Sequence, residues 1–170
     1  QRGKVFFSGR EAVSYHNDPK KTAAARSPQG YSTMGDLGYL DDDGYLFLTD
    51  REAFTIISGG VNVYPREVEE AISTDSRVAE AAVFGSPDND LGEVVTAVLE
   101  LQHDCEPTLE IAKMIRERLR SHLSPHKLPR KLAFVDQMPL TDSGKIHKAR
   151  LRDTWESRCD HVYERTVLDD

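Results

Sequence analysis

Three short segments of the sequence combine residue types that could take part in chemistry, and the first is centred on Asp36. Glycines at positions 35 and 38 would let a ligand approach the backbone closely. The Asp36 carboxylate could then accept two hydrogen bonds from the hydroxyl groups of a ribose. The same pattern is typical of an aspartate that satisfies the backbone of its own turn. Spacing alone leaves both interpretations open.

The second segment contains Arg51 and the turn-forming residues Ser58, Gly59 and Gly60. A guanidinium group offers directed donors to a hydroxyl or phosphate group. The paired glycines would let a thin ligand chain pass close to the backbone. The alternative is a surface ion pair between Arg51 and Asp50, followed by an ordinary glycine turn.

The third segment is Ser143-Gly144-Lys145, in which one ammonium group follows a glycine on an expected loop. Such a group could reach into a cleft and neutralise negative charge that develops on a phosphate or carboxylate. A solvated surface lysine is the alternative and is the usual fate of this residue type. The sequence contains no Ser/His/Asp set, zinc-ligand spacing or Walker loop, so we expect no metal site within this chain.

Residues 1–50 are expected to surround the first segment with strands. The pattern predicts a strand at 4–8, a short helix that Asp18 caps and Pro19 begins, and two strands over 31–49 joined by a turn at 41–44. This part is too small to close a core of its own, which favours a truncated sheet or barrel.

Residues 51–160 predict a second, separate domain of the α+β class. Strands are expected at 54–57, 78–84, 94–101 and 131–135, and helices at 65–73, 107–120 and 148–155. The last three strands are expected to form a small core sheet with the helices packed on it. Residues 161–170 are expected to be a flexible tail.

The composition is that of a soluble globular protein. The chain has 170 residues, of which 38% are hydrophobic and 30% charged, and no apolar run approaches the ~20 residues of a membrane span. A net charge of −7 argues against a general nucleic-acid binder, although the basic stretch 116–152 could hold a local anion. Cys105 and Cys159 are isolated, as expected for free thiols in a reducing cytoplasm. The start at Gln1, without Met or a signal peptide, suggests a fragment boundary.

Taken together, the motifs resemble the C-terminal part of the adenylate-forming superfamily. That superfamily includes acyl- and aryl-CoA synthetases, peptide-synthetase adenylation domains and beetle luciferases. Four blocks occur in the family's order and span nearly the whole chain. They are residues 31–38, which resemble the Thr-Gly-Asp block, Asp50-Arg51, residues 56–69 and residues 139–145.

The resemblance implies an acyl-CoA synthetase as the parent protein. A carboxylic or fatty acid would react with ATP, assisted by Mg²⁺, to give an acyl-adenylate, and the thiol of CoA would then displace AMP. By this similarity Asp36 and Arg51 hold the ribose, and Lys145 bridges the carboxylate and the α-phosphate. After a rotation of the C-terminal domain, Ser58, Gly59 and Gly60 line the pantetheine tunnel.

Two positions depart from the family pattern. Met34 stands where the block has threonine, which removes a hydroxyl group beside the nucleotide site. Ala53 stands at the hinge position, which is usually Asp or Lys; alanine still permits the helical and extended states that a hinge needs. Local charge also makes Lys127, Arg130 and Lys131 candidates for contacts with the phosphates of CoA.

The large N-terminal domain of such enzymes has no counterpart in this chain, so we expect the chain alone to be inactive in adenylation. Two alternatives remain at this point. The chain could belong to an adenylation domain that loads a carrier protein, although no carrier-like segment follows it here. It could instead be a non-catalytic α+β interaction domain in which the matched blocks are relics.

Overall fold

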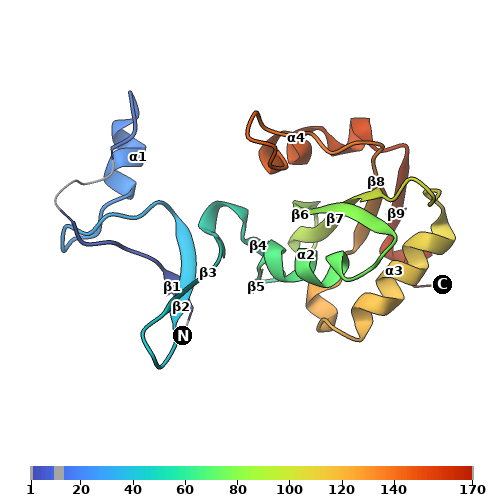
Figure 1. Cartoon of the computed structure of the whole chain (residues 1–170), viewed down its shortest axis with the longest axis horizontal. Helices are drawn as coiled ribbons and strands as arrows, with labels where there is room; N and C mark the ends of the chain where they lie inside the picture. The colour runs from blue at the N-terminus through green and yellow to red at the C-terminus, as the bar shows by residue number, and fades with distance from the viewer. Residues whose placement is uncertain (1, 10–13, 170) are drawn as a thin grey trace. The chain divides into compact units, whose positions relative to one another are not determined.

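The computed structural model describes residues 2–9 and 14–169 and divides into two compact units, Gln1–Phe54 and Thr55–Asp170 (Figure 1). The boundary lies a few residues after the predicted one, which follows residue 50. None of the described helices is long and apolar enough to cross a membrane. Each unit has its own sheet, and the two are described separately.

The N-terminal unit is built on a small antiparallel sheet with the order β1-β2-β3. In chain order its elements are β1 (Gly3–Lys4), α1 (Pro19–Ala24), β2 (Asp36–Leu40), β3 (Leu46–Arg51) and the 3₁₀ turn η1 (Glu52–Phe54). The predicted helix start is confirmed, because Asp18 Oδ1 accepts a hydrogen bond from the backbone N–H of Lys21 (2.9 Å). The predicted turn at 41–44 is confirmed as well, since Asp41 Oδ1 accepts from the backbone of Tyr45 at 2.8 Å.

The C-terminal unit is an α+β domain, as predicted, around a six-stranded sheet. Its strands are β4 (Ile56–Ser58), β5 (Val61–Val63), β6 (Val78–Asp88), β7 (Gly92–Leu101), β8 (Lys131–Phe134) and β9 (His161–Glu164). Its helices are α2 (Pro65–Ser73), α3 (Leu109–Arg120), η2 (Pro125–Lys127), α4 (Lys148–Arg158) and α5 (Arg165–Leu168). The strand order is β5-β4-β7-β8-β9, with β6 pairing with β7. The three predicted core strands β6, β7 and β8 are present, and three further strands extend them.

Helices cover both faces of this sheet. Alternate residues of β6 show the division, because Val83 packs with the residues of α2 and α3 while Phe84 packs with those of α4. On the α4 side, the rings of Phe84 and Trp155 lie 6.3 Å apart. Figure 1 shows α4 on one side of the sheet and α2 and α3 on the other. Two separate apolar layers therefore hold the domain together.

The end of the chain differs from the expected flexible tail. β9 pairs antiparallel with β8, the ring of Tyr163 contacts that of Phe134 edge-on at 6.0 Å, and Leu168 is buried. Only four residues form β9, and three of them are polar or aromatic, so no apolar alternation marks the strand in the sequence. Its stability comes from pairing with β8, which would otherwise be an exposed edge.

Candidate functional site

Asp36 and Arg51 are brought together by the β2–β3 ladder. They are register partners on adjacent strands, and Arg51 Nε lies 3.2 Å from Asp36 Oδ1. The Arg51 side chain is 62% exposed, whereas that of Asp36 is 16% exposed. Asp50 Oδ1 accepts a hydrogen bond from the backbone N–H of Arg51 (2.7 Å). The two predicted nucleotide residues therefore form one polar pair on the sheet.

The turn before β2 explains how the departure at Met34 alters this region. Thr33 is buried, and its Oγ1 accepts a hydrogen bond from the backbone N–H of Gly35 (3.0 Å). Gly35 has a φ of 82°, which glycine tolerates and other residues rarely adopt. Met34 instead is 53% exposed. The Thr33 hydroxyl group thus stabilises the turn, and the exposed side chain at position 34 is a thioether.

Ala53 lies in η1, the last element of the N-terminal unit. The preceding residue, Glu52, donates its backbone N–H to Gly35 O (2.8 Å) and pairs through its carboxylate with Lys4 Nζ (2.7 Å). Ala53 itself is exposed. The predicted hinge residue Ala53 therefore follows Glu52, whose backbone and side chain both make polar contacts within the N-terminal unit.

The turn at Ser58, Gly59 and Gly60 joins β4 to β5, and its shape requires glycine. Gly59 and Gly60 have φ values of 56° and 79°. The backbone N–H of Gly59 donates to Leu91 O at 3.0 Å, which ties the hairpin to the turn between β6 and β7. A Cβ at Gly59 would lie 3.2 Å from the Leu91 side chain. A side chain at position 59 is therefore disfavoured by both backbone and packing.

Lys145 lies on a tight loop between Leu140 and Ile146, whose backbones form an isolated β-bridge. The backbone N–H of Thr141 donates to Lys145 O (2.7 Å), and Thr141 Oγ1 accepts from the backbone N–H of Lys145 (3.2 Å). Gly144 has a φ of 77°, which permits the reversal of the chain. Lys145 is exposed, and among the described residues none pairs with its ammonium group. The loop thus presents a positive charge on a fixed backbone.

The start of α4, which follows this loop, is held to the domain by an ion pair. The motifs in the sequence did not indicate this pair. Lys148 Nζ lies 2.7 Å from Glu69 Oε1, and both side chains are largely buried, at 20% and 17% exposed. Glu69 Oε1 also accepts from the backbone N–H of Val83 (2.7 Å), so one carboxylate joins α2, β6 and the start of α4. The two residues are 79 positions apart, and no local pattern in the sequence marks the contact.

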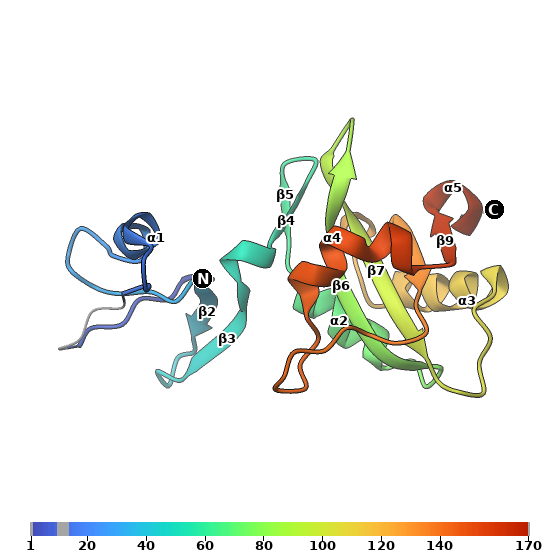
Figure 2. The ribbon, with the colours of Figure 1, turned by 90° about the horizontal axis from the view of Figure 1, so that it is seen from above.

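The Lys145 loop and the Gly59-Gly60 turn lie apart in the C-terminal unit. Both views show the loop before α4 and the β4–β5 hairpin at different edges of the unit (Figures 1 and 2). The structure therefore brings Asp36 and Arg51 together, but does not bring Lys145 to the glycine turn.

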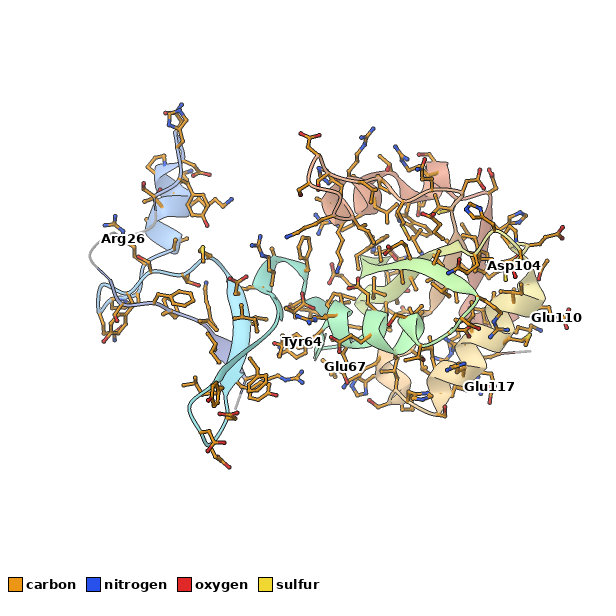
Figure 3. The ribbon with its side chains drawn as sticks, viewed as in Figure 1. Arg26, Tyr64, Glu67, Asp104, Glu110 and Glu117 are labelled. Carbon is orange, nitrogen blue, oxygen red and sulfur yellow. The ribbon has the colours of Figure 1, made fainter. Side chains whose placement is uncertain are left out.

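The basic residues considered for CoA phosphates have different contacts within the domain. Lys127 Nζ is paired with Glu67 Oε1 at 2.5 Å, and Glu67 lies on α2 (Figure 3). The ammonium group of Lys131 lies 5.7 Å from the centre of the Trp155 ring. Arg130 instead lines a pocket at the far end of α3. Two of the three cations are thus already engaged within the domain.

Cysteine, histidine and acidic side chains are the residue types that could hold a metal ion in this chain. Both Cys105 and Cys159 are free thiols, and burial raises the pKa of Cys159 to about 11. No group of three or more His, Cys, Asp or Glu side chains is arranged to hold a metal ion among the described residues.

Residues 67–145 match the family model described as AMP-binding enzyme C-terminal domain. A 2-succinylbenzoate–CoA ligase of Bacillus pumilus is 36% identical over 152 residues, which cover 89% of this chain and 30% of that protein. A long-chain-fatty-acid–CoA ligase of Bacillus subtilis is also 36% identical, over 89% of this chain and 26% of its own length. The solved o-succinylbenzoate CoA synthetase of Bacillus subtilis, in complex with its acyl-adenylate intermediate, has a TM-score of 0.76 and 34% identity, over 90% of this chain and 31% of that chain. The chain spans less than a third of each of these relatives.

Proposed function

We propose that the chain carries the AMP-binding C-terminal domain of an adenylate-forming enzyme and is part of an acyl-CoA synthetase. The observation that carries the proposal is the match of residues 67–145 to that domain, because this stretch runs from α2 to the Lys145 loop. The relatives named above are CoA ligases, which favours CoA over a carrier protein as the acyl acceptor.

The proposed reaction has two steps. An oxygen of the acid carboxylate attacks the α-phosphorus of ATP, and the bond to pyrophosphate breaks to give an acyl-adenylate. The sulfur of CoA then attacks the acyl carbon, AMP leaves, and the thiol proton is released. Mg²⁺ would assist by offsetting phosphate charge, but the described residues offer no cluster of ligands for it, so no step of this chain is assigned to the metal.

In the first step we assign Lys145 to the developing negative charge between the carboxylate and the α-phosphate. The assignment is supported by an ammonium group without an ion-pair partner among the described residues, on a loop whose backbone is fixed. A positioned charge of this kind stabilises the transition state more than the ground state. The Glu69–Lys148 ion pair helps to hold the Lys145 loop in position, because it fixes the start of α4 three residues after Lys145.

Replacing Lys145 by Ala in the enzyme that contains this chain tests the assignment. We expect ATP–pyrophosphate exchange to fall by about 100- to 1,000-fold, the usual cost of removing one group that stabilises developing charge. Thioester formation from preformed acyl-adenylate should be largely retained. Lys20→Ala, at an exposed lysine on α1, is the control and should leave both steps unchanged. Equal loss in both steps would exclude the proposed role of Lys145.

For the nucleotide we assign the Asp36–Arg51 pair to the ribose hydroxyls. The pair uses Asp36 Oδ1 and Arg51 Nε, so Oδ2 and the terminal guanidinium nitrogens remain to accept from and donate to a sugar. Because the two side chains already contact each other, little side-chain freedom is lost when the ribose binds.

For the change between the two steps we assign the pivot to Ala53 and the pantetheine side to Ser58, Gly59 and Gly60. Proline at position 53 fixes φ near −65°, so Ala53→Pro in the complete enzyme should block thioester formation and spare adenylation. Ala53→Gly is the matched control, because glycine keeps both backbone states accessible. A proline variant that retains the second step would move the pivot to another residue.

A further inference from the structure

Two carboxylates of the C-terminal unit hold the chain on either side of the Lys145 loop. Before the loop, Glu100 Oε2 accepts a hydrogen bond from the backbone N–H of Met138 at 2.7 Å. After the loop, Glu69 Oε1 lies 2.7 Å from Lys148 Nζ. The first carboxylate comes from β7 and the second from α2. The loop is therefore anchored at both ends to elements that are distant from it in the sequence.

Between these two anchors the loop is closed by its own backbone. The backbone N–H of His147 donates to Pro139 O at 2.7 Å. One turn further out, the backbone N–H of Thr141 donates to Lys145 O at the same distance. These bonds join the two strands of the loop to each other. The place of Lys145 relative to the sheet is then set by where the ends of the loop are attached.

Both anchors are partly shielded from water. The side chains of Glu69 and Lys148 are 17% and 20% exposed. Met138 is 3% exposed and belongs to the apolar layer beneath α4. Glu100 follows Val98 of the same layer by two positions, so both side chains project from the same face of β7. A hydrogen bond to a charged group is stronger in such a setting than on the surface, because water and salt screen it less.

We propose that Glu69 and Glu100 are positioning residues for the ammonium group of Lys145 in the adenylation step. The proposal rests on the function proposed above, because the two carboxylates act only through Lys145. A group that stabilises developing charge has to be in place before the reaction, and a displacement of about 1 Å can cost about 100-fold in rate. Lys145 is exposed, and no ion pair holds it among the described residues, so the attachment of the loop limits its position.

Hydrogen exchange on the 170-residue chain tests whether the two contacts hold the loop. Lys148→Met removes the ammonium group and keeps much of the apolar stem, and Glu100→Met removes the acceptor at a similar length. In each variant the backbone amide protons of Thr141 and Lys145 should exchange about tenfold faster, because a loop that has lost one anchor opens more readily. Unchanged exchange in both variants would overturn the proposal.

Glu67→Gln is the matched control. Glu67 lies two positions before Glu69 on α2 and pairs with Lys127 (Figure 3). The two side chains of this pair are 35% and 23% exposed, and the pair joins α2 to η2 instead of to the start of α4. The control variant should leave the exchange of both amide protons unchanged.

ATP–pyrophosphate exchange by the complete enzyme tests the catalytic consequence. Lys148→Met and Glu100→Met should each lower kcat for this exchange by about 10- to 100-fold. KM for ATP should stay within about twofold, because the ribose is assigned to Asp36 and Arg51. Thioester formation from preformed acyl-adenylate should be retained. Lys148→Arg and Glu100→Gln keep a cation and an acceptor at the two positions, and should retain most of the exchange rate.

A double-mutant cycle shows whether the anchors act through Lys145. In the Lys145→Ala background, Lys148→Met and Glu100→Met should each lower ATP–pyrophosphate exchange by no more than about twofold further, because the group that they position is already absent. A full further loss in that background would overturn the proposal. So would equal loss of both half-reactions in the methionine variants, since a general effect on the fold would then explain them.

The same measurements separate this proposal from the proposed function. If Lys145→Ala left ATP–pyrophosphate exchange unchanged, the role of Lys145 and that of its anchors would both be wrong. If Lys145→Ala lowered the exchange and the two methionine variants did not, the positioning role alone would be excluded. Thermal unfolding checks that each variant is folded. Glu69→Gln and Glu100→Asp take the place of a methionine variant that does not fold, because both remain polar and still weaken the contact.

Discussion

The two units of the chain differ in how they bury their apolar residues. In the C-terminal unit, Ile72, Leu99, Leu132 and their neighbours are fully buried between a sheet and its helices. In the described part of the N-terminal unit, Ala25 is the one buried apolar residue. Successive residues of β3 there remain 41–47% exposed, from Leu46 to Leu48.

This difference separates the roles that the two units could have. The predicted nucleotide residues Asp36 and Arg51 lie on a sheet whose apolar side chains need cover from another surface. Lys145 and the Gly59-Gly60 turn lie on a domain with two apolar layers of its own. A domain that is stable by itself can move as a body without losing the geometry of its loops. The contrast therefore agrees with the proposed exchange of Lys145 for the glycine turn.

Separating the units should have the largest effect. Residues 55–170 expressed alone are expected to unfold cooperatively in urea, with Trp155 fluorescence as the probe, because both apolar layers lie within this segment. Residues 1–54 alone should show the narrow amide proton dispersion of an unfolded chain. A well-dispersed spectrum of residues 1–54 would contradict the comparison, and so would a non-cooperative transition of residues 55–170.

Single core substitutions should reproduce the contrast on a smaller scale. Leu99→Ala removes a fully buried side chain and should lower the free energy of unfolding by about 2–5 kcal/mol. Leu46→Ala is the matched substitution, at a side chain that is 41% exposed. It should change the free energy of unfolding by about 0.5 kcal/mol or less. Urea unfolding of the whole chain measures both. Similar losses would show that Leu46 also contributes to a core.

Local patterns in the sequence were sufficient for much of the fold. The cap at Asp18, the helix that Pro65 begins and the three core strands follow from side-chain types within a few residues of each other. β9 and α5 could not be predicted in this way, because their stability depends on β8 and α3. β6 also continues beyond the predicted end at Phe84, since pairing with β7 extends to Asp88.

The candidate site shows the same limit. The motifs marked Asp36, Arg51 and Lys145, and the register of β2 and β3 then accounts for the contact between the first two. The Glu69–Lys148 pair and the contacts of Asp169 with Arg116 and Arg120 join residues about 50 to 80 positions apart. Such pairs are set by how helices pack on the sheet, and spacing in the sequence does not encode them.

Acid titration should show the smallest and most specific difference between the units. Burial acts to raise the pKa of Asp169, but hydrogen bonds from Arg165, Arg116 and Arg120 outweigh it and lower the pKa to about 2 from an ordinary 3.8. A carboxyl group with a lowered folded-state pKa stabilises the protein above its unfolded-state value, and this contribution is lost as the pH falls from about 4 towards 2.

In phosphate-free buffer at pH 7, Asp169→Asn should therefore lower the free energy of unfolding by about 1–2 kcal/mol, a value kept small because the carboxylate is partly exposed. The difference in the free energy of unfolding between Asp169→Asn and the unmodified chain should become smaller as the pH falls from 4 to 3. Asp36→Asn breaks an ion pair whose arginine is 62% exposed and should cost about 0.5 kcal/mol or less. Urea midpoints across this pH range measure both variants. A constant gap for Asp169→Asn would mean that the carboxylate charge does not hold α5 in place, and would leave Leu168 and β9 as the contacts that do.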